Sequence, residues 1–378
     1  MDFNLSEEQE LIQANMREFC AEYVDPIAVE IDESSRWPAE VFAKLGEMGW
    51  MGMTFPTEYG GAGLDYVTYA IVAEELSRSS AAVCLDFCCH ILGSLVINNY
   101  GNEQQKQKYL VPLSEGQRFG CFAITEPGAG TDVGALTTTA VLDGDSYVLN
   151  GVKTFITNGP TADTFVILAY TDKSKGAKGM STFIVTKDSP GFRVGDHFKK
   201  MGLRASQTSE LILKDCRIPR ENLLGGEGNG LRIAMASLDH GRIGIASQAI
   251  GIAQAALDES ISYSKQRIQF GKPISKNQAI QWMIADMETN IAAARFLTHY
   301  AASLRDQGKP FGKEAAMAKL FASEMANKCA SKAVQVHGGY GYMRGIKVER
   351  LLRDVKITEI YEGTSEAMRM TIAGAALR

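Results

Sequence analysis

The chain has 378 residues, of which 45% are hydrophobic and 22% are charged, and its formal net charge is -5. This length exceeds the size at which a single core stops growing, so we expect two or three domains. The mild negative charge and the lack of a clustered basic stripe argue against a nucleic-acid-binding protein. The first residues show no export signal, and the apolar runs are broken before 18 positions, so we predict neither secretion nor membrane insertion.

Seven cysteines are scattered along the chain, and an odd, dispersed set in a chain without an export signal favours a reducing cytoplasm. Cys84, Cys88, Cys89 and His90 could suggest a metal site. No second Cys/His cluster supplies the remaining ligands, so we interpret these residues as part of a buried helix and expect no metal.

Residues 1–117 are predicted to form an N-terminal α-helical domain. Ser6 and Gln9 match a capping box, and an apolar stripe follows until Pro26 ends the helix. Further helices are expected at 38–45, 66–77 and 103–113, with a loop at 58–63.

Residues 118–226 are predicted to form a middle β domain, a barrel or a sandwich, because the hydrophobic period changes near residue 118. Asp143-Gly144-Asp145 is a strong hairpin signal. The expected strands are 119–125, 138–142, 147–149, 152–157, 165–170, 182–186 and 209–213. The loop from Thr125 to Asp132 could be an ordinary turn or a site for a flat polar ligand or a phosphate, and the residues leave both open.

Residues 227–378 are predicted to form a C-terminal α-helical bundle, with long Ala-rich helices at 231–266, 277–306 and 313–337. The whole fold is therefore mainly α with a central β domain. Because helices and strands do not alternate, and because the glycines at 338–341 complete no phosphate-loop pattern, a dinucleotide-binding fold of the βαβ type is not expected.

Glu362 is the preferred candidate for a catalytic base. Gly363 leaves room for a substrate beside the carboxylate, while Thr364 and Ser365 can cap the terminal helix and turn its N–H groups toward an anion. The alternative is an exposed Glu that precedes a helix cap.

Taken together, several segments resemble the acyl-CoA dehydrogenase family, in particular its short-chain, butyryl-CoA-like members. The resemblance covers nearly the whole chain, in the order of the family. The segments that carry it are 122–132, 155–159, 238–244, 267–273, 335–341 and 360–364.

This resemblance implies a homotetramer built from two dimers, with FAD bound between the β domain and the C-terminal helices and partly by a neighbouring subunit. The flavin ring would be lined by Phe122, Ala123, Ile124, Thr125, Thr131, Phe155, Ile156 and Thr157. The phosphates and adenosine would be held by Arg267, Gln278, Gln335, Val336, His337, Gly338 and Gly339, with further contacts from Thr364, Ser365 and Glu366. The acyl-CoA substrate would contact Thr131, Asp239, His240, Gly241, Arg242 and Gly363. A surface ion pair for Arg267 and a solvated helix face for Asp239 are the alternative interpretations.

The implied reaction is α,β-dehydrogenation: Glu362 removes the α-proton of the thioester while flavin N5 accepts the β-hydride, and an electron-transferring flavoprotein takes the electrons. Burial should raise the pKa of Glu362, and its backbone N–H and a ribityl hydroxyl of FAD would stabilise the enolate oxygen. One alternative is an enoyl-CoA reductase subunit of an anaerobic electron-bifurcating complex. A second is an acyl-CoA oxidase, although such chains are usually longer. A third is a catalytically silent flavin- or CoA-binding scaffold, and the presence of Glu362 argues against it.

The sequence departs from the family pattern at four places. Some branches carry the base near residue 241, where this chain has Gly241. His240 stands where many short-chain members have Met or Gly, Thr131 replaces a common Ser, and residues 343–347 replace a frequent Tyr-Pro pair. The first departure supports Glu362 as the base.

Overall fold

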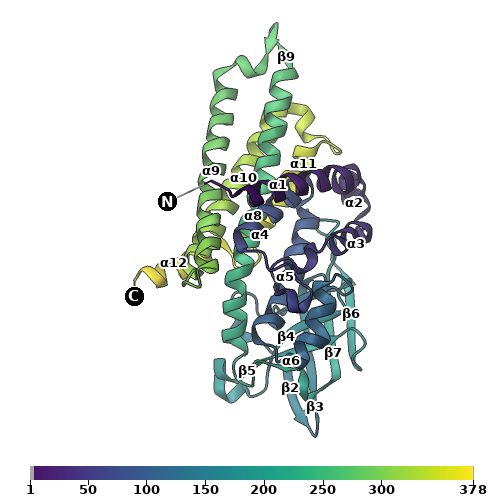
Figure 1. Cartoon of the computed structure of the whole chain (residues 1–378). Helices are drawn as coiled ribbons and strands as arrows, with labels where there is room; N and C mark the ends of the chain where they lie inside the picture. Colours follow the sequence, from purple (N-terminus) through teal and green to yellow (C-terminus); the bar gives the residue numbers. More distant parts are fainter. Residues whose placement is uncertain (1–3, 378) are drawn as a thin grey trace.

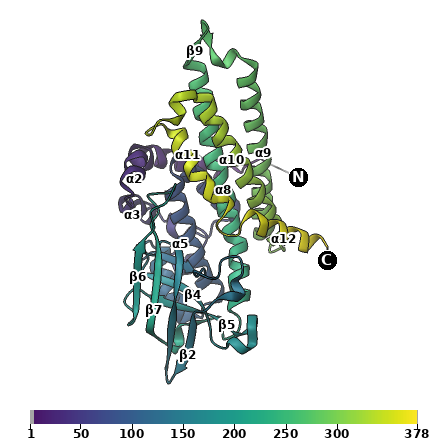
Figure 2. The same ribbon diagram turned by 180° about the vertical axis from the view of Figure 1, so that it is seen from behind.

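The computed structural model describes residues 4–377 and has three parts (Figure 1). The N-terminal helices pack beside the long C-terminal helices, and the β-sheet lies at one end of them, as the view from behind also shows (Figure 2). The predicted fold class, helices around a central β unit, is confirmed. The domain limits near residues 117 and 226 stay predictions. Residues 1–3, where the search for an export signal began, and residue 378 lie outside the described residues.

The N-terminal part contains α1 (Glu7–Phe19), α2 (Ala28–Ser34), α3 (Ala39–Glu47), α4 (Tyr66–Ser79), α5 (Ala81–Tyr100), α6 (Glu103–Gln105) and α7 (Val111–Ser114). The capping box is confirmed, because the Ser6 and Gln9 side chains each accept the backbone N–H of the other. The predicted helix end is confirmed, because α1 and the π-helical turn Cys20–Val24 that continues it end just before Asp25-Pro26. Pro26 occupies the first turn of a 3₁₀ segment, where no intrahelical N–H is needed, and this segment leads into α2.

Helix α5 forms much of the core between the N-terminal helices and the sheet. Among the described residues it is the single helix long and apolar enough to cross a membrane, and 89% of that apolar window is buried inside the fold. Polar residues such as Asp86 and His90 interrupt its apolar sequence, as expected. Its burial is that of a core helix, because the apolar residues contact other helices and β1 on all sides.

Eight strands of the middle part form one sheet in the order β6-β7-β3-β2-β4-β5-β8, with β1 beside β4. They are β1 (Gly120–Ala123), β2 (Thr139–Asp143), β3 (Ser146–Thr157), β4 (Thr164–Tyr170), β5 (Met180–Thr186), β6 (Phe192–His197), β7 (Thr208–Pro219) and β8 (Leu223–Leu224). The predicted hairpin is confirmed, since Asp143 pairs with Ser146 around Gly144. The two strands predicted at 147–149 and 152–157 are one strand, which shifts register against β7 at two irregularities.

The C-terminal part contains α8 (Gly230–Gln266), α9 (Gln278–Asp306), α10 (Gly312–His337), α11 (Lys347–Val355) and α12 (Ser365–Ala376). The three long helices agree with the predicted ranges within one residue at each end. A small hairpin of β9 (Ile268–Gln269) and β10 (Lys272–Pro273), absent from the predictions, projects beyond the end of α8 (Figure 1).

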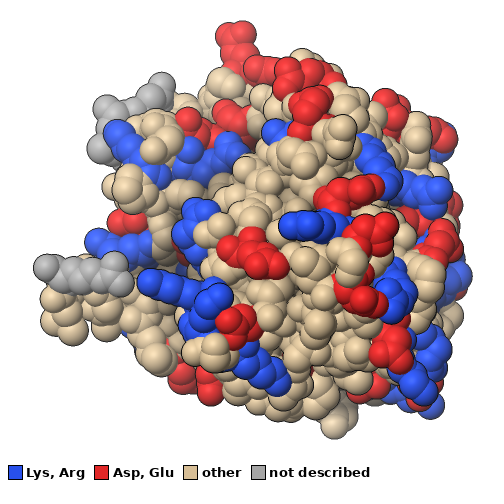
Figure 3. Space-filling view, turned by 90° about the horizontal axis from the view of Figure 1, so that it is seen from below, with Lys and Arg blue, Asp and Glu red and all other residues tan. Residues whose placement is uncertain are grey.

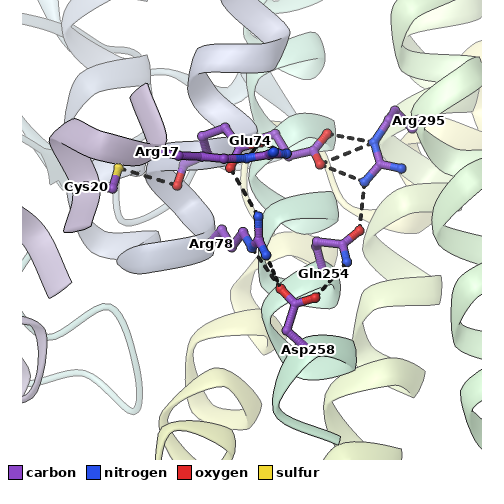
Figure 4. Close-up of polar contacts among 8 residues, drawn as sticks. Arg17, Cys20, Glu74, Arg78, Gln254, Asp258 and Arg295 are labelled. Carbon is purple, nitrogen blue, oxygen red and sulfur yellow. Dashed lines mark hydrogen bonds and ion pairs between the residues drawn. The ribbon is translucent and has the colours of Figure 1, made fainter. Parts of the chain in front are cut away.

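Ion pairs join the N-terminal and C-terminal helices (Figure 4). Arg17 on α1 holds Glu75 on α4 at 2.8 Å, and Arg295 on α9 holds Glu74 on α4 at 2.7 Å and Gln254 on α8 at 2.9 Å. Both glutamates are buried, so the loss of Arg295 would leave the Glu74 carboxylate uncompensated in the interior. Glu75 also lies 3.5 Å from Arg78, which pairs with Asp258 on α8 at 2.7 Å. The network therefore fixes α4 against α8, the helix that carries part of the candidate site.

Charged side chains of both signs are interspersed on the described surface seen from below in Figure 3. A nucleic-acid backbone needs a continuous basic track, and this face does not offer one.

Candidate active site

Glu362 lies in a sharp turn between the 3₁₀ segment Lys356–Glu359 and α12. Its φ is +49°, and that of Gly363 is +98°, so two successive residues adopt left-handed conformations. A Cβ on Gly363 would collide with Cε of Met368. Glycine is thus required here for the turn itself, in addition to the room for substrate that the sequence suggested.

The Glu362 side chain points at α8, directly at Gly241. A Cβ built on Gly241 would lie 2.9 Å from the carboxyl carbon of Glu362 and still closer to Oε2, and real Cβ atoms essentially never come within 3.0 Å of another group. The absence of a side chain at residue 241 is therefore what lets this carboxyl group reach its position. Residues 241 and 362, the two sequence positions at which the resembling family carries its base, are thus in direct contact.

Glu362 is half-buried as a residue, and its Oε2 is buried without a hydrogen-bond partner. Burial raises the pKa of Glu362 to about 7, and the positive charges of Lys319 and Arg242 keep it from rising further. This is the direction predicted from the sequence. An exposed glutamate before a helix cap is excluded.

Two cations flank this carboxyl group from different helices. Lys319 on α10 is fully buried and donates to Gly363 O at 2.5 Å, and Arg242 on α8 pairs with Asp239 at 2.5 Å. The Nε of Arg242 is buried without a partner. Sequence reasoning missed Lys319, although it falls among small residues on the buried face of α10, which is an unusual place for a lysine.

Asp239 and His240 lie on the α8 turn next to Gly241. Asp239 is partly exposed and paired with Arg242, so it is more than a solvated residue of a helix face. His240 packs edge-on against Tyr66 at 5.2 Å and Phe311 at 4.9 Å, and burial lowers its pKa to about 3. The imidazole is therefore neutral. His240, which departs from the residues common in the family, belongs to an aromatic cluster beside the site.

The residues predicted to face a flavin ring gather at one end of the sheet. Phe122 and Ala123 lie on β1, Ile124 and Thr125 follow it, Thr131 lies in the exposed loop, and Phe155, Ile156 and Thr157 end β3. Thr154 N donates to Thr125 O at 2.9 Å, which joins the two segments. Phe155 has φ +56° and is 66% exposed, so its ring is presented outward by a strained backbone.

A buried ion pair supports this end of the sheet. Lys153 Nζ lies 2.8 Å from Glu126 Oε1, and both side chains are almost completely buried. Glu126 also accepts hydrogen bonds from Thr137 and from Thr138 N. Burial favours the neutral carboxyl, but Lys153 and these donors outweigh it and lower the pKa of Glu126 to about 2. Glu126 therefore anchors the loop as an ordered element, in which Glu126 and Ala129 exchange backbone hydrogen bonds as in a tight turn, and both alternatives for residues 125–132 stay open.

A groove of about 680 Å³ lies at the far end of α8. It is lined by Arg267, Val336, His337, Gly338 and Gly339 of the predicted phosphate and adenosine site, together with Tyr263, Gln269, Ile274, Tyr340 and Met343.

The chemistry of this groove suits an anionic group joined to a flat ring. The Arg267 guanidinium stands 5.8 Å from the Tyr340 ring and has no ion pair with any described residue, while His337 stacks on Tyr263 at 4.3 Å. A Cβ on Gly338 or Gly339 would meet nothing within 4 Å, so the backbone is open to a ligand. Met343, the first residue of the segment 343–347 that departs from the family pattern, also lines this groove.

Other predicted contacts lie outside this groove. Gln335 and Gln278 are exposed and do not line it. Thr364 alone caps α12, since its Oγ1 accepts Ala367 N at 3.2 Å, and Ser365 is the first helical residue. Glu366 points to solvent.

One chain does not bring the two predicted parts of the cofactor site together. Glu362 meets α8 at Gly241, and Phe122 and Ile124 pack in one cluster with Ala234 near the start of α8. Arg267 follows the last residue of α8, about 40 Å beyond Gly241 along the axis at 1.5 Å per residue. Figure 1 shows the β9 hairpin at the opposite end of the molecule from the sheet.

Comparison with known families accounts for almost all of the chain. Residues 6–117, 121–216 and 228–377 match the models for the acyl-CoA dehydrogenase N-terminal, middle and C-terminal domains. The chain belongs to the acyl-CoA dehydrogenase family.

Among acyl-CoA dehydrogenases, the chain is 52% identical to the short-chain specific enzyme of Clostridium acetobutylicum, over the full length of both. It is 49% identical to the acryloyl-CoA reductase (NADH) of Anaerotignum propionicum, covering 100% of this chain and 96% of that one.

Solved acyl-CoA dehydrogenase structures superpose closely. Butyryl-CoA dehydrogenase from Megasphaera elsdenii matches with a TM-score of 0.98 and 45% identity over both chains. A chain from the work on the electron transferring flavoprotein of Acidaminococcus fermentans and flavin-based electron bifurcation matches with a TM-score of 0.99 and 50% identity, again over both chains. An acyl-CoA dehydrogenase from Bacillus anthracis complexed with FAD matches with a TM-score of 0.94 and 35% identity, over 99% of this chain and 67% of that one.

Proposed function

We propose that this protein oxidises a short-chain acyl-CoA thioester to the trans-2-enoyl-CoA, with Glu362 removing the α-proton. The observation that carries this proposal is the Glu362 carboxyl group, with Oε2 buried and free of partners and its pKa raised to about 7. A base works best when its pKa lies near the working pH, since it is then both available and basic enough. Burial also keeps water from the carbanion-like charge that develops on the substrate.

FAD fits the residues that this chain presents. When bound, FAD supplies the acceptor for the β-hydride. The exposed Phe155 ring and the anchored loop after β1 suit a flavin ring, and the groove with Arg267 suits a pyrophosphate and an adenine. The backbone N–H of Glu362 and the Arg242 guanidinium stand beside the carboxyl group, where they would orient the thioester.

The divided cofactor site supports a dimer in which the groove of one chain meets the sheet of another, and the resemblance to the family extends this expectation to a homotetramer built from two dimers. Exposed apolar side chains support this assembly. Phe270 at the tip of the β9 hairpin is 99% exposed, and Trp282, Phe296 and Tyr300 expose their rings along α9.

Bulky side chains behind Glu362 support a short acyl group. The Tyr69 hydroxyl lies against Gly244, one turn of α8 beyond Gly241, with Cys88 Sγ beside it. The Tyr361 hydroxyl bonds to Gln248 still further along α8. This packing fills the space into which a long chain would extend.

Electrons are expected to pass to an electron-transferring flavoprotein, and the structure related to the Acidaminococcus work supports such a partner. The same likeness, with the 49% identity to an acryloyl-CoA reductase, favours a second candidate, in which the site runs in the reverse direction as an enoyl-CoA reductase. The seven cysteines are all free thiols, which suits the reducing cytoplasm that we expect.

Anaerobic titration of the FAD-loaded protein with saturated and unsaturated thioesters of increasing length, followed by flavin absorbance, tests the proposal. We expect butyryl-CoA to bleach the flavin, and crotonyl-CoA to restore the absorbance of the chemically reduced enzyme. Addition of NADH and electron-transferring flavoprotein to enzyme with crotonyl-CoA then separates the two directions. A flavin that no thioester bleaches would contradict both candidates.

A further inference from the structure

Lys319 is a completely buried lysine in the middle of α10. Burial of an ammonium group is costly unless a specific partner compensates it. Its hydrogen-bond partner is Gly363 O, at 2.5 Å, in the turn that carries Glu362. This contact joins residues that are 44 positions apart in the sequence.

The turn held by Lys319 needs such support. Glu362 and Gly363 have φ values of +49° and +98°, and a non-glycine residue in this region is strained. The Thr364 cap fixes the chain on the side of α12, and Lys319 fixes it on the side of α10. Without the ammonium group, the turn would lose the contact that holds the Gly363 carbonyl.

Lys319 also dominates the charge around Glu362. The charged groups near this carboxyl group are Lys319 on α10 and Arg242 on α8, and Asp239 already pairs with Arg242. The half-buried thiol of Cys89 on α5 and the hydroxyl of the neighbouring Tyr361 also interact with it. Glu359 and Glu366 act on Lys319 from its other side.

We propose that Lys319 is a positioning residue for proton abstraction: its ammonium group fixes the Glu362–Gly363 turn, and its charge sets the pH at which the Glu362 carboxylate becomes available. The inference rests on the proposed function of Glu362 as the base. Arg242 also acts on the Glu362 carboxyl group, but it pairs with Asp239, whereas Lys319 donates to Gly363 O in the turn itself.

The test compares Lys319→Met and Lys319→Gln, which remove the charge, with Lys319→Arg, which keeps it. Lys332→Met is the matched control on the same helix, because Lys332 makes only an exposed pair with Asp286. Each FAD-loaded variant is mixed anaerobically with butyryl-CoA between pH 6 and pH 9.5, and the rate of flavin bleaching is measured.

Loss of a nearby positive charge moves a carboxyl pKa upward by on the order of one unit. In both neutral variants, the acid limb of the profile of bleaching rate against pH should therefore shift to higher pH by about one unit. The bleaching rate should fall about fivefold at pH 7 and recover near pH 9. The Arg variant and the Lys332 control should keep the wild-type limb. A limb that does not move in Lys319→Gln, or a loss that is equal at every pH, overturns the inference.

A second readout needs no turnover. The infrared band of the protonated Glu362 carboxyl group, identified by its absence in Glu362→Gln, can be titrated in each variant without substrate. We expect its midpoint to rise in Lys319→Gln, and an unchanged midpoint overturns the inference. If wild-type flavin is bleached by no thioester, the proposed function fails, while this titration still tests Lys319.

Discussion

Glu362→Gln should stabilise the protein in a manner that depends on pH. The pKa of Glu362 is raised from 4.5 to about 7 by burial, so the folded state holds a proton that the unfolded state has released between these values. Stability from this group therefore falls as pH rises from 4.5 to 7. A shift of this size corresponds to about 3 kcal/mol above pH 7, and to less than about 1 kcal/mol at pH 5. Glutamine has the same shape and no such penalty.

The assay is urea unfolding of FAD-saturated wild type and Glu362→Gln at pH 5 and pH 8. We expect the variant to gain about 2.5 kcal/mol more at pH 8 than at pH 5, because the glutamine side chain does not ionise. An equal difference at the two pH values would refute the reasoning, since it would mean that Glu362 titrates normally in the folded protein.

Three further substitutions test separate parts of the account. Gly241→Ala should slow flavin bleaching at least about tenfold while FAD is retained, because the added Cβ would displace the Glu362 carboxyl group that it faces. Gly374→Ala, on an open helix surface, is the control. An unaffected rate for Gly241→Ala would count against the contact between residues 241 and 362. Arg267→Ala should release FAD on dialysis, and normal flavin content would argue against the groove as a phosphate site. Lys153→Met should destabilise the fold by about 3 to 5 kcal/mol in urea because Glu126 is left buried and unpaired, and a change below about 1 kcal/mol would contradict that description.

The long helices were predictable because Ala-rich segments bounded by Gly and Pro leave few alternatives, and 231–266 was predicted where α8 spans 230–266. Strand β6 was missed because Phe192–His197 combines glycine with charged residues and lies at a sheet edge, where no alternating core face is needed. Pro26 correctly marked the end of the first helix, but the sequence did not show that α2 would follow after a single 3₁₀ turn, since a proline is equally compatible with the first turn of a new helical segment.

The site residues could be predicted only where they belong to a motif of the family that the sequence resembles. Glu362 and Gly241 could both be singled out, yet their direct contact depends on how α8 and the last turn pack, which periodicity along one segment does not specify. Nothing in the sequence marked Lys319 as a site residue, because a lysine in an Ala-rich helix is usually solvated. Its role depends on burial by neighbouring helices, and this is a property of the folded chain.

The central claim is that the Glu362 carboxylate removes the α-proton, and single-turnover mixing with butyryl-CoA under anaerobic conditions tests it most directly. A positioned general base contributes roughly 10² to 10⁴ in rate. We predict that Glu362→Gln, with FAD content and thioester binding matched to wild type, loses bleaching by a factor in that range. Bleaching at the wild-type rate in this variant would contradict the account.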